Sequence, residues 1–404
     1  MSHEVNLRCS VLLVMGACLV ACNTSPRVRP GIEVLLSDSL HLLADARVGL
    51  LTNQTGVGRD GSSDVELLLE AGVALTALFS PEHGFRGVLD DAAIGHRVDS
   101  ATGLPIYSLY GDTRSPTPEM LDRIDVLAID LQDIGARTYT YISTVLLAMR
   151  AARGTATRIV ILDRPNPIGG MLIHGPLMTS EDTSFVGVLR IPMRHGLTLG
   201  ELALYGNDEL GLGADLTVVP AAGWRRAEWF DDTGLPWVRP SPSMPDLESA
   251  THYPGLVLFE ATNLSVGRGT PIAFQIIAAP WLRPSLVAQS LTAHRGVAIS
   301  DTVVTPNQPP DGKYGGVALP ALRLVVTDRE AYNPVEVATD LLAAVYAAHG
   351  DSLTIRASRL RRLAGNDALR QVVVTGGDLG QLWARWLVDG ETFAARRKQF
   401  LLYH

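Results

Sequence analysis

Short apolar runs alternate with helical patterns through most of the chain. The runs are rich in Val, Ile and Leu and end in polar residues, which is typical of buried strands. Strands are therefore predicted at 46–51, 73–79, 104–111, 125–131 and 157–163. Helices are predicted between them, at 62–72, from Thr117 onward and at 138–153. Apolar strands that alternate with helices indicate an α/β fold whose parallel sheet is covered on both faces.

The second half of the chain follows a different pattern. A segment rich in Pro and aromatic residues, 229–249, interrupts the alternation and is predicted to cross between two units. Beyond it we predict a strand at 322–329 and helices at 334–350 and within 377–403. We place a domain boundary near Tyr253. The expected organisation is a parallel-sheet domain over 46–252 and a C-terminal α/β domain over 253–404.

Polar side chains directly follow four of the predicted strands. They are Asn53, Glu82, His83, Arg86, Gln132, Asp133, Arg137, Arg164 and Asn166. Parallel strands end at a common edge of the sheet, and ligands of open α/β sheets bind in the crevice outside it. A shared binding site is therefore predicted there. No G-x-G-x-x-G pattern follows the first strand, so a dinucleotide cofactor is not indicated.

The N-terminus has the pattern of an export signal. The apolar stretch 11–21 follows Arg8, is too short to span a bilayer and ends in "LVAC", which resembles a bacterial lipobox. We predict a signal peptide over 1–21, lipidation of Cys22, and a tether and lead-in over 22–45. The protein would then be an exported lipoprotein held on the periplasmic face or the cell surface. An ordinary secretory signal or a buried helix remains the alternative.

Composition excludes several classes of function. The net charge is −8 and no long basic run is present, so a nucleic-acid partner is disfavoured. The three cysteines are Cys9, Cys18 and Cys22, so the mature chain would have no free thiol for catalysis or metal binding. The ten His are not spaced as metal ligands, and no H-E-x-x-H, G-x-S-x-G or P-loop motif occurs. No metal and no cofactor are expected.

Glu82, in the segment "FSPEHGFRG", is the best candidate for a catalytic acid. A carboxyl group behind a buried strand is partly desolvated, which raises its pKa and suits it to protonate a leaving-group oxygen. His83 is predicted to tune Glu82 or to hold substrate. The alternative is a surface ion pair between Glu82 and Arg86, which would have no catalytic meaning.

Other polar segments suit a sugar ligand. "DLQDIGARTYTY" supplies Asp133, Arg137 and Tyr139, which offer acceptors, a cation and an aromatic face; helix capping is the alternative role for Asp133. Glu201 is predicted to form a capping box with Thr198. Further candidates for substrate binding are Arg194, His195, Glu260, Asn263 and Arg268. Arg268 lies between two glycines and is the natural partner for a carboxylate on the ligand.

A series of segments, in order along the chain, resembles the motifs of the NamZ-type exo-β-N-acetylmuramidases. They are "SPEHGFRG", "DLQDIGARTYTY", "DRPNPIGG", "RHGLTLGELA", "PSPSMP", "YPGLVLFEATNLSVGRGT" and "APW", with "LRRLAGNDALRQ" and "RRKQFLLY" near the C-terminus. The resemblance extends from about Arg47 to Tyr403. It departs from the family's usual pattern at Ser243, at Ala261, and in "RGTPIAF" and "AAPW", all near the domain junction.

The resemblance implies a glycosidase that releases β-1,4-linked N-acetylmuramic acid from the non-reducing ends of peptidoglycan fragments. It also implies a Rossmann-like N-terminal domain, a smaller C-terminal domain and a cleft between them. The family's proposed acid falls on Glu82. The lactyl carboxylate of the sugar needs a cation, for which the candidates are Arg137, Arg164, Arg194 and Arg268.

The mechanism stays open among retaining, inverting and substrate-assisted routes, because the sequence does not give the separation of the carboxylates. Two other classes of protein share part of the pattern. A lipid-anchored binding protein for cell-wall sugars would need cations and aromatics but no catalytic acid. A wall-anchored structural protein would bind no small ligand.

Overall fold

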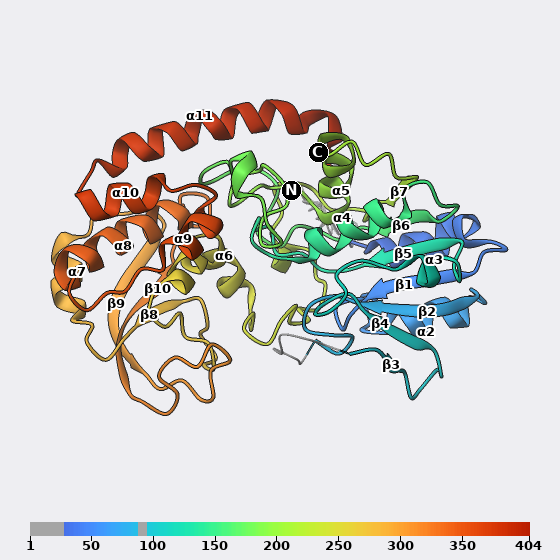
Figure 1. The fold of residues 1–404 in the computed structure, drawn as a ribbon, viewed down its shortest axis with the longest axis horizontal. Coiled ribbons are helices and arrows are strands. Elements are labelled where there is room, and N and C mark those ends of the chain that lie inside the picture. Colours follow the sequence, from blue (N-terminus) through green and yellow to red (C-terminus); the bar gives the residue numbers. More distant parts are fainter. Residues whose placement is uncertain (1–27, 88–94) are drawn as a thin grey trace, which may run out of the picture.

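The computed structural model describes residues 28–87 and 95–404. The predicted signal peptide and Cys22 lie outside this range. The chain forms two domains side by side, and the last long helix runs across both (Figure 1). None of the helices in the described part is both long enough and apolar enough to cross a membrane.

The N-terminal domain is built on a seven-stranded sheet in the order β3-β4-β2-β1-β5-β6-β7. The strands are β1 (Val48–Thr52), β2 (Leu75–Ser80), β3 (Arg97–Val98), β4 (Pro105–Ser108), β5 (Val126–Asp130), β6 (Arg158–Leu162) and β7 (Leu216–Val219). All neighbours pair in parallel except the short edge strand β3. The six parallel strands lie in the order third, second, first, fourth, fifth, sixth, which is the Rossmann order. The predicted α/β fold with a mostly parallel sheet is therefore confirmed.

The two faces of the sheet bury separate sets of apolar side chains. One face packs under α2 (Asp64–Glu70) and the N-terminal segment that contains α1 (Gly31–Val34). The other packs under α4 (Tyr141–Ala152) and α5 (Leu199–Glu209), with α3 (Pro118–Leu121) beside them. Burial on both faces explains why β1 and β5 read as unbroken apolar runs, since every side chain in both strands is buried.

Residues 28–45, expected to be part of a tether and lead-in, pack onto the sheet domain. Ile32 and Leu35 are completely buried. The Gly31 N–H donates to the Asp163 carbonyl oxygen (2.8 Å), and Arg29 pairs with Ala222. This segment therefore belongs to the core of the N-terminal domain.

The C-terminal domain combines a small antiparallel sheet with helices. Its strands lie in the order β8-β10-β9 and span Ile276–Ala278, Leu319–Val326 and Val297–Val304. Its helices are α6 (Leu247–Leu256), α7 (Pro284–Ser290), α8 (Pro334–His349), α9 (Ala357–Ala364), α10 (Ala368–Thr375) and α11 (Leu379–Arg397). The predicted boundary at Tyr253 falls inside α6. Strand β9 was not predicted because its side chains alternate between half-buried and exposed positions, unlike the other runs.

The C-terminus returns to the N-terminal domain (Figure 1). Arg397, at the end of α11, is buried and donates to the backbone oxygens of His195 (2.6 Å) and Gly196 (3.0 Å). The Tyr403 hydroxyl donates to Asp163 Oδ2 (2.7 Å). These buried contacts fasten the helix that spans both domains, and with it their relative position.

Candidate active site in the interdomain cleft

A cleft of about 690 Å³ opens between the two domains. The N-terminal domain supplies loops that follow β2 and β4, the residues just before α4, and the loop 184–186. The C-terminal domain supplies α6, α9 and the segments around Glu260 and Asp311. The polar and aromatic side chains in its wall are Glu82, His83, Tyr110, Arg114, Thr138, Tyr139, Thr140, Ser184, Phe185, Ser241, Tyr253, Glu260, Arg268, Phe274, Asp311, Arg359 and Arg362.

Glu82 lies in a tight turn that ends β2. The Gly84 N–H donates to the Pro81 carbonyl oxygen (3.1 Å), and His83 adopts a left-handed backbone with φ 70°. Such conformations are uncommon outside glycine and persist where the surrounding structure enforces them. The half-buried Glu82 side chain accepts a hydrogen bond at Oε2 from the Thr140 hydroxyl. Thr140 immediately precedes α4, so two separate elements fix the position of this carboxyl group.

Arg86 does not pair with Glu82 in the described part of the chain. Its guanidinium lies 4.0 Å from Asp99, and 72% of its side chain is exposed. The structure thus lacks the surface ion pair that offered a non-catalytic explanation for Glu82. Arg86 itself lies outside the cleft wall.

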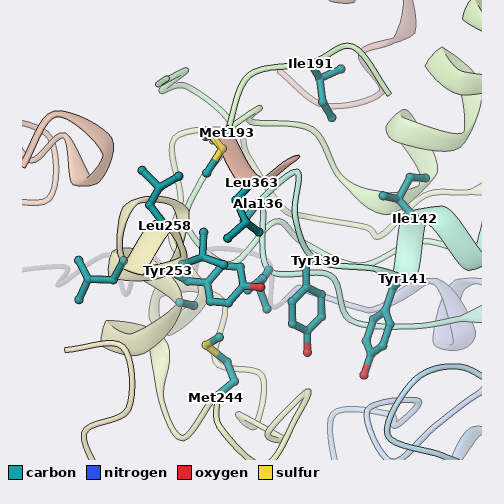
Figure 2. Packing of buried hydrophobic residues seen from close by; sticks show 14 of the residues in the cluster. Ala136, Tyr139, Tyr141, Ile142, Ile191, Met193, Met244, Tyr253, Leu258 and Leu363 are labelled. Carbon is teal, nitrogen blue, oxygen red and sulfur yellow. The ribbon is translucent and has the colours of Figure 1, made fainter. Parts of the chain in front are cut away.

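Three tyrosines stand beside Glu82. The ring of Tyr139 meets that of Tyr141 edge-on at 4.8 Å and that of Tyr253 edge-on at 5.9 Å. Figure 2 shows Tyr139 between the other two, with the Tyr253 hydroxyl pointing toward it. Burial raises the pKa of all three phenols, so each remains protonated and can donate a hydrogen bond. Tyr139 and Tyr253 belong to the cleft wall.

Glu260 is another carboxyl group in the cleft wall, and two arginines contact it. It lies 2.5 Å from the Arg268 guanidinium and 3.2 Å from that of Arg359. Burial alone would raise the pKa of Glu260, but the stronger effect of these arginines holds it below the ordinary value. Glu260 is therefore ionised. The carboxylate expected to pair with Arg268 is supplied by the protein itself.

The structure brings five predicted site residues to the cleft and leaves the others away from its wall. Those in the cleft are Glu82, His83, Tyr139, Glu260 and Arg268. Those outside it are Asn53, Arg86, Gln132, Asp133, Arg137, Arg164, Asn166, Arg194, His195 and Asn263. Except for Arg86 and Asn263, this second group is buried. Asn263 borders a neighbouring cavity of about 540 Å³ and bonds to the backbone of Ser352 and Thr354.

The crossing segment explains why the strand ends do not form one open site. Gln54 Nε2 donates to the carbonyl oxygen of Arg239 (2.7 Å), and the Tyr141 hydroxyl donates to the carbonyl oxygen of Pro240 (2.5 Å). The space outside β1 that remains between this segment and Arg164 is about 10 Å³. The crossing segment thus fills the crevice at the end of β1, and the open cleft lies to one side of it.

Three of the four arginines considered for the sugar carboxylate have structural partners. Arg137 donates to the carbonyl oxygens of Pro176 (2.7 Å), Ile191 (2.8 Å) and Leu363 (2.8 Å). Arg164 is paired with Asp130, and Arg194 stacks over Trp229 at 5.0 Å. Each of these side chains is at most 5% exposed. They tie loops together and do not reach a ligand in the cleft.

Asn53, Gln132 and Asn166 also bond within the protein. Asn53 Nδ2 donates to the Tyr141 hydroxyl (2.7 Å), Gln132 Nε2 to the Pro165 oxygen (2.9 Å), and Asn166 Nδ2 to the Leu197 oxygen (2.9 Å). Polar groups this deeply buried need such partners. Their role is to hold the loops that carry the tyrosines and the strand ends.

Asp133 and His195 face each other behind the cleft wall. His195 Nε2 lies 4.0 Å from Asp133 Oδ1, which accepts the Gly135 N–H (2.7 Å). Burial raises the pKa of Asp133 to about 7 and lowers that of His195 to about 3. Below about pH 7 the Asp133 carboxyl group therefore keeps its proton, while His195 is neutral.

The raised pKa of the buried Asp133 predicts a pH-dependent stability. The folded state keeps a proton on Asp133 that the unfolded chain releases above about pH 4, so Asp133 makes folding less favourable as pH rises from about 4 to 7. In Asp133→Asn the group cannot titrate. Relative to wild type, the variant should gain about 1.4 kcal/mol per pH unit between pH 5 and 6, and less as the pH approaches 7. Urea denaturation at several pH values checks this, and two parallel curves would contradict it.

Several residues of the cleft were not predicted from the sequence. Thr140 lies in the same motif as Tyr139, and Ser241 lies in "PSPSMP", so both had a signal that could have found them. Tyr110 lies inside the predicted strand at 104–111, two residues beyond the point where β4 ends in the structure. Arg362 lies in "LRRLAGNDALRQ", which also resembles the family, whereas Arg359 had no signal because an arginine on a helix is more often part of a solvated face.

Two further features of the described chain were considered as functional sites: an apolar cavity and possible metal-binding groups. A cavity of about 620 Å³ at residues 40–47 and 71–74 lies at the start of β1 and is lined mostly by Ala and Leu. Within 28–87 and 95–404 no group of three or more His, Cys, Asp and Glu is placed to hold a metal ion.

Comparisons with known proteins identify the family. Residues 48–248 match the family described as exo-beta-N-acetylmuramidase NamZ, N-terminal, and residues 251–403 match its C-terminal counterpart. The chain belongs to the NamZ family. It is 39% identical over 383 residues to the peptidoglycan beta-N-acetylmuramidase NamZ of Bacillus subtilis (strain 168), covering 94% of this chain and 92% of that protein.

Two solved structures share the NamZ-family fold seen here. They are the DUF1343 family proteins BF0371 and BF0379 of Bacteroides fragilis NCTC 9343. BF0371 has a TM-score of 0.85 and 36% identity, and BF0379 has 0.75 and 31%. Each comparison covers 94% of this chain and 99% of the other. The family seen in the sequence motifs is thus confirmed over nearly the whole chain.

Proposed function

We propose that the interdomain cleft releases β-1,4-linked N-acetylmuramic acid from the non-reducing ends of peptidoglycan fragments. The observation that carries this proposal is Glu82: a half-buried carboxyl group, oriented by Thr140, among tyrosines and in a cleft large enough for sugars. The kinship to a peptidoglycan beta-N-acetylmuramidase supports the reaction class.

In this proposal Glu82 is the general acid. The Thr140 hydroxyl occupies Oε2, so Oε1 is the oxygen that holds the proton for the glycosidic oxygen. Proton transfer lets the leaving sugar depart as an alcohol while positive charge develops at the anomeric carbon. The deprotonated Glu82 then adds negative charge to the cleft, which favours such a transition state.

The tyrosines orient the sugar. Tyr139 and Tyr253 form a mostly buried aromatic part of the cleft wall, which suits the apolar side of a pyranose. Asp133, predicted as a further catalytic group, lies behind that wall, so we assign it no contact with the sugar.

The test uses a soluble form that begins at Asn23 and a glycan with N-acetylmuramic acid at its non-reducing end. Mass spectrometry should detect free N-acetylmuramic acid as the first product, together with the glycan shortened by one sugar. Release of disaccharides would contradict the exo mode. Binding without release of any sugar would favour a lipid-anchored binding protein.

We also propose that Cys22 carries the lipid that holds the protein on a membrane. The support is the sequence pattern 11–22 alone. The globular domain begins by Val28, so at most a few residues would separate it from the lipid. Cys22→Ser is expected to move the protein from the membrane fraction to the soluble fraction. A Cys22→Ser protein that stays with the membrane would contradict lipidation at this residue.

A further inference from the structure

The substrate's lactyl group carries a negative charge that distinguishes N-acetylmuramic acid from N-acetylglucosamine. Of the four arginines suggested by the sequence, only Arg268 reaches the cleft, and its guanidinium is bound to Glu260. Arg359 shares the same carboxylate. The cleft arginines that have no carboxylate partner in the described chain are therefore better placed to bind the lactyl group.

The Arg114 guanidinium is available to bind a carboxylate. It follows β4, its side chain is exposed, and it forms no ion pair with any residue of 28–87 or 95–404. Its guanidinium lies over the Phe185 ring, 4.6 Å from the centroid. Stacking on an aromatic face holds a guanidinium in place while its N–H groups stay available to a carboxylate.

Arg114 is also tied to the element that orients Glu82. The Phe185 carbonyl oxygen accepts the Ser143 hydroxyl (2.7 Å), and Ser143 lies one helical turn after Thr140, the partner of Glu82. The Ser115 hydroxyl donates to the Leu147 oxygen (3.1 Å), one further turn along α4. A turn of helix advances about 5 Å. Helix α4 therefore sets the spacing between the catalytic acid and Arg114.

We propose that Arg114, supported by Phe185, binds the lactyl carboxylate and makes the enzyme specific for N-acetylmuramic acid. The inference rests on the proposed function. In the sugar, the lactyl oxygen is attached two ring carbons from the anomeric centre, so its carboxylate lies close to the bond that Glu82 cleaves. Arg362 is the other cleft arginine without an ion pair in the described chain. It belongs to α9 of the opposite domain, not to the segments held by α4.

The test compares two substrates that differ only in charge. One is the disaccharide N-acetylmuramyl-β-1,4-N-acetylglucosamine, and the other is its lactyl carboxamide. Wild type should prefer the carboxylate. Arg114→Gln should lower kcat/KM for the carboxylate about 10- to 100-fold, the loss expected for a charge-assisted hydrogen bond. It should leave kcat/KM for the carboxamide within about twofold. Arg362→Gln is the matched control and should keep the wild-type preference.

The outcomes separate this inference from the proposed function. Equal losses on both substrates would make Arg114 a structural support of the cleft wall and overturn the inference. A preference for the carboxylate that survives Arg114→Gln but disappears in Arg362→Gln would assign the role to the other arginine. A wild type that does not discriminate shows that no cation reads the lactyl group. A wild type that releases no sugar overturns the proposed function as well.

Discussion

Glu82→Gln is expected to lower kcat for release of N-acetylmuramic acid by about 10²- to 10⁴-fold, the range typical of a general acid. The amide has the shape of the carboxyl group, and its oxygen can still accept the Thr140 hydroxyl. The variant therefore keeps the local structure but has no acidic proton to donate. Initial rates of sugar release from the disaccharide measure the effect.

The matched control is Glu70→Gln. Glu70 is exposed at the end of α2 and distant in the fold from the interdomain cleft, so its variant should retain wild-type activity. Thermal denaturation of both variants should give midpoints close to that of wild type. Activity of Glu82→Gln within about tenfold of wild type would show that another group protonates the leaving oxygen.

Arg164→Met is expected to destabilise the protein by about 3–5 kcal/mol, because it leaves a buried carboxylate without its partner. Arg164 and Asp130 are 5% and 0% exposed, and their side chains make two hydrogen bonds, one of them 2.9 Å long. Burial works against the charge of Arg164, yet Asp130 holds its pKa above the ordinary value. Urea denaturation followed by fluorescence measures the loss.

Arg150→Met serves as the control for Arg164→Met. Arg150 is exposed in the last turn of α4, and its replacement should change the free energy of unfolding by no more than about 0.5 kcal/mol. One result for Arg164→Met would instead support the substrate-binding role that the sequence suggested for Arg164. If Arg164→Met keeps its urea midpoint but raises KM, the guanidinium contacts substrate, and the ion pair is dispensable.

Local signals in the sequence predicted much of the scaffold. Thr198 forms the predicted capping box with Glu201, and Ser63 forms another with Glu66. Such motifs depend on residues three apart, so no tertiary information is needed. The half-exposed strand β7 was missed because its side chains are not all buried and its apolar run is short.

The roles of the arginines were harder to predict. Arg137, Arg164 and Arg268 occupy loops that suggest ligand binding, yet each is held by a partner distant in sequence or by a buried carboxylate. For Arg137 one such partner is Leu363, which is 226 positions away. A sequence shows that a cation is present, but its charge is available to a ligand only if the fold leaves it unpaired.

By itself, the sequence determined the parallel α/β scaffold, the family and the turn that carries Glu82. Each of these depends on short-range pattern: apolar runs, helix caps and motifs in a fixed order. Only the tertiary structure decided which strand ends open to a ligand. The crossing segment fills the crevice at β1 through contacts such as Gln54 with Arg239, 185 positions apart. The proposed site therefore lies in the interdomain cleft, whose wall includes Glu82, Arg114 and Glu260, because packing between distant segments determines where space is left.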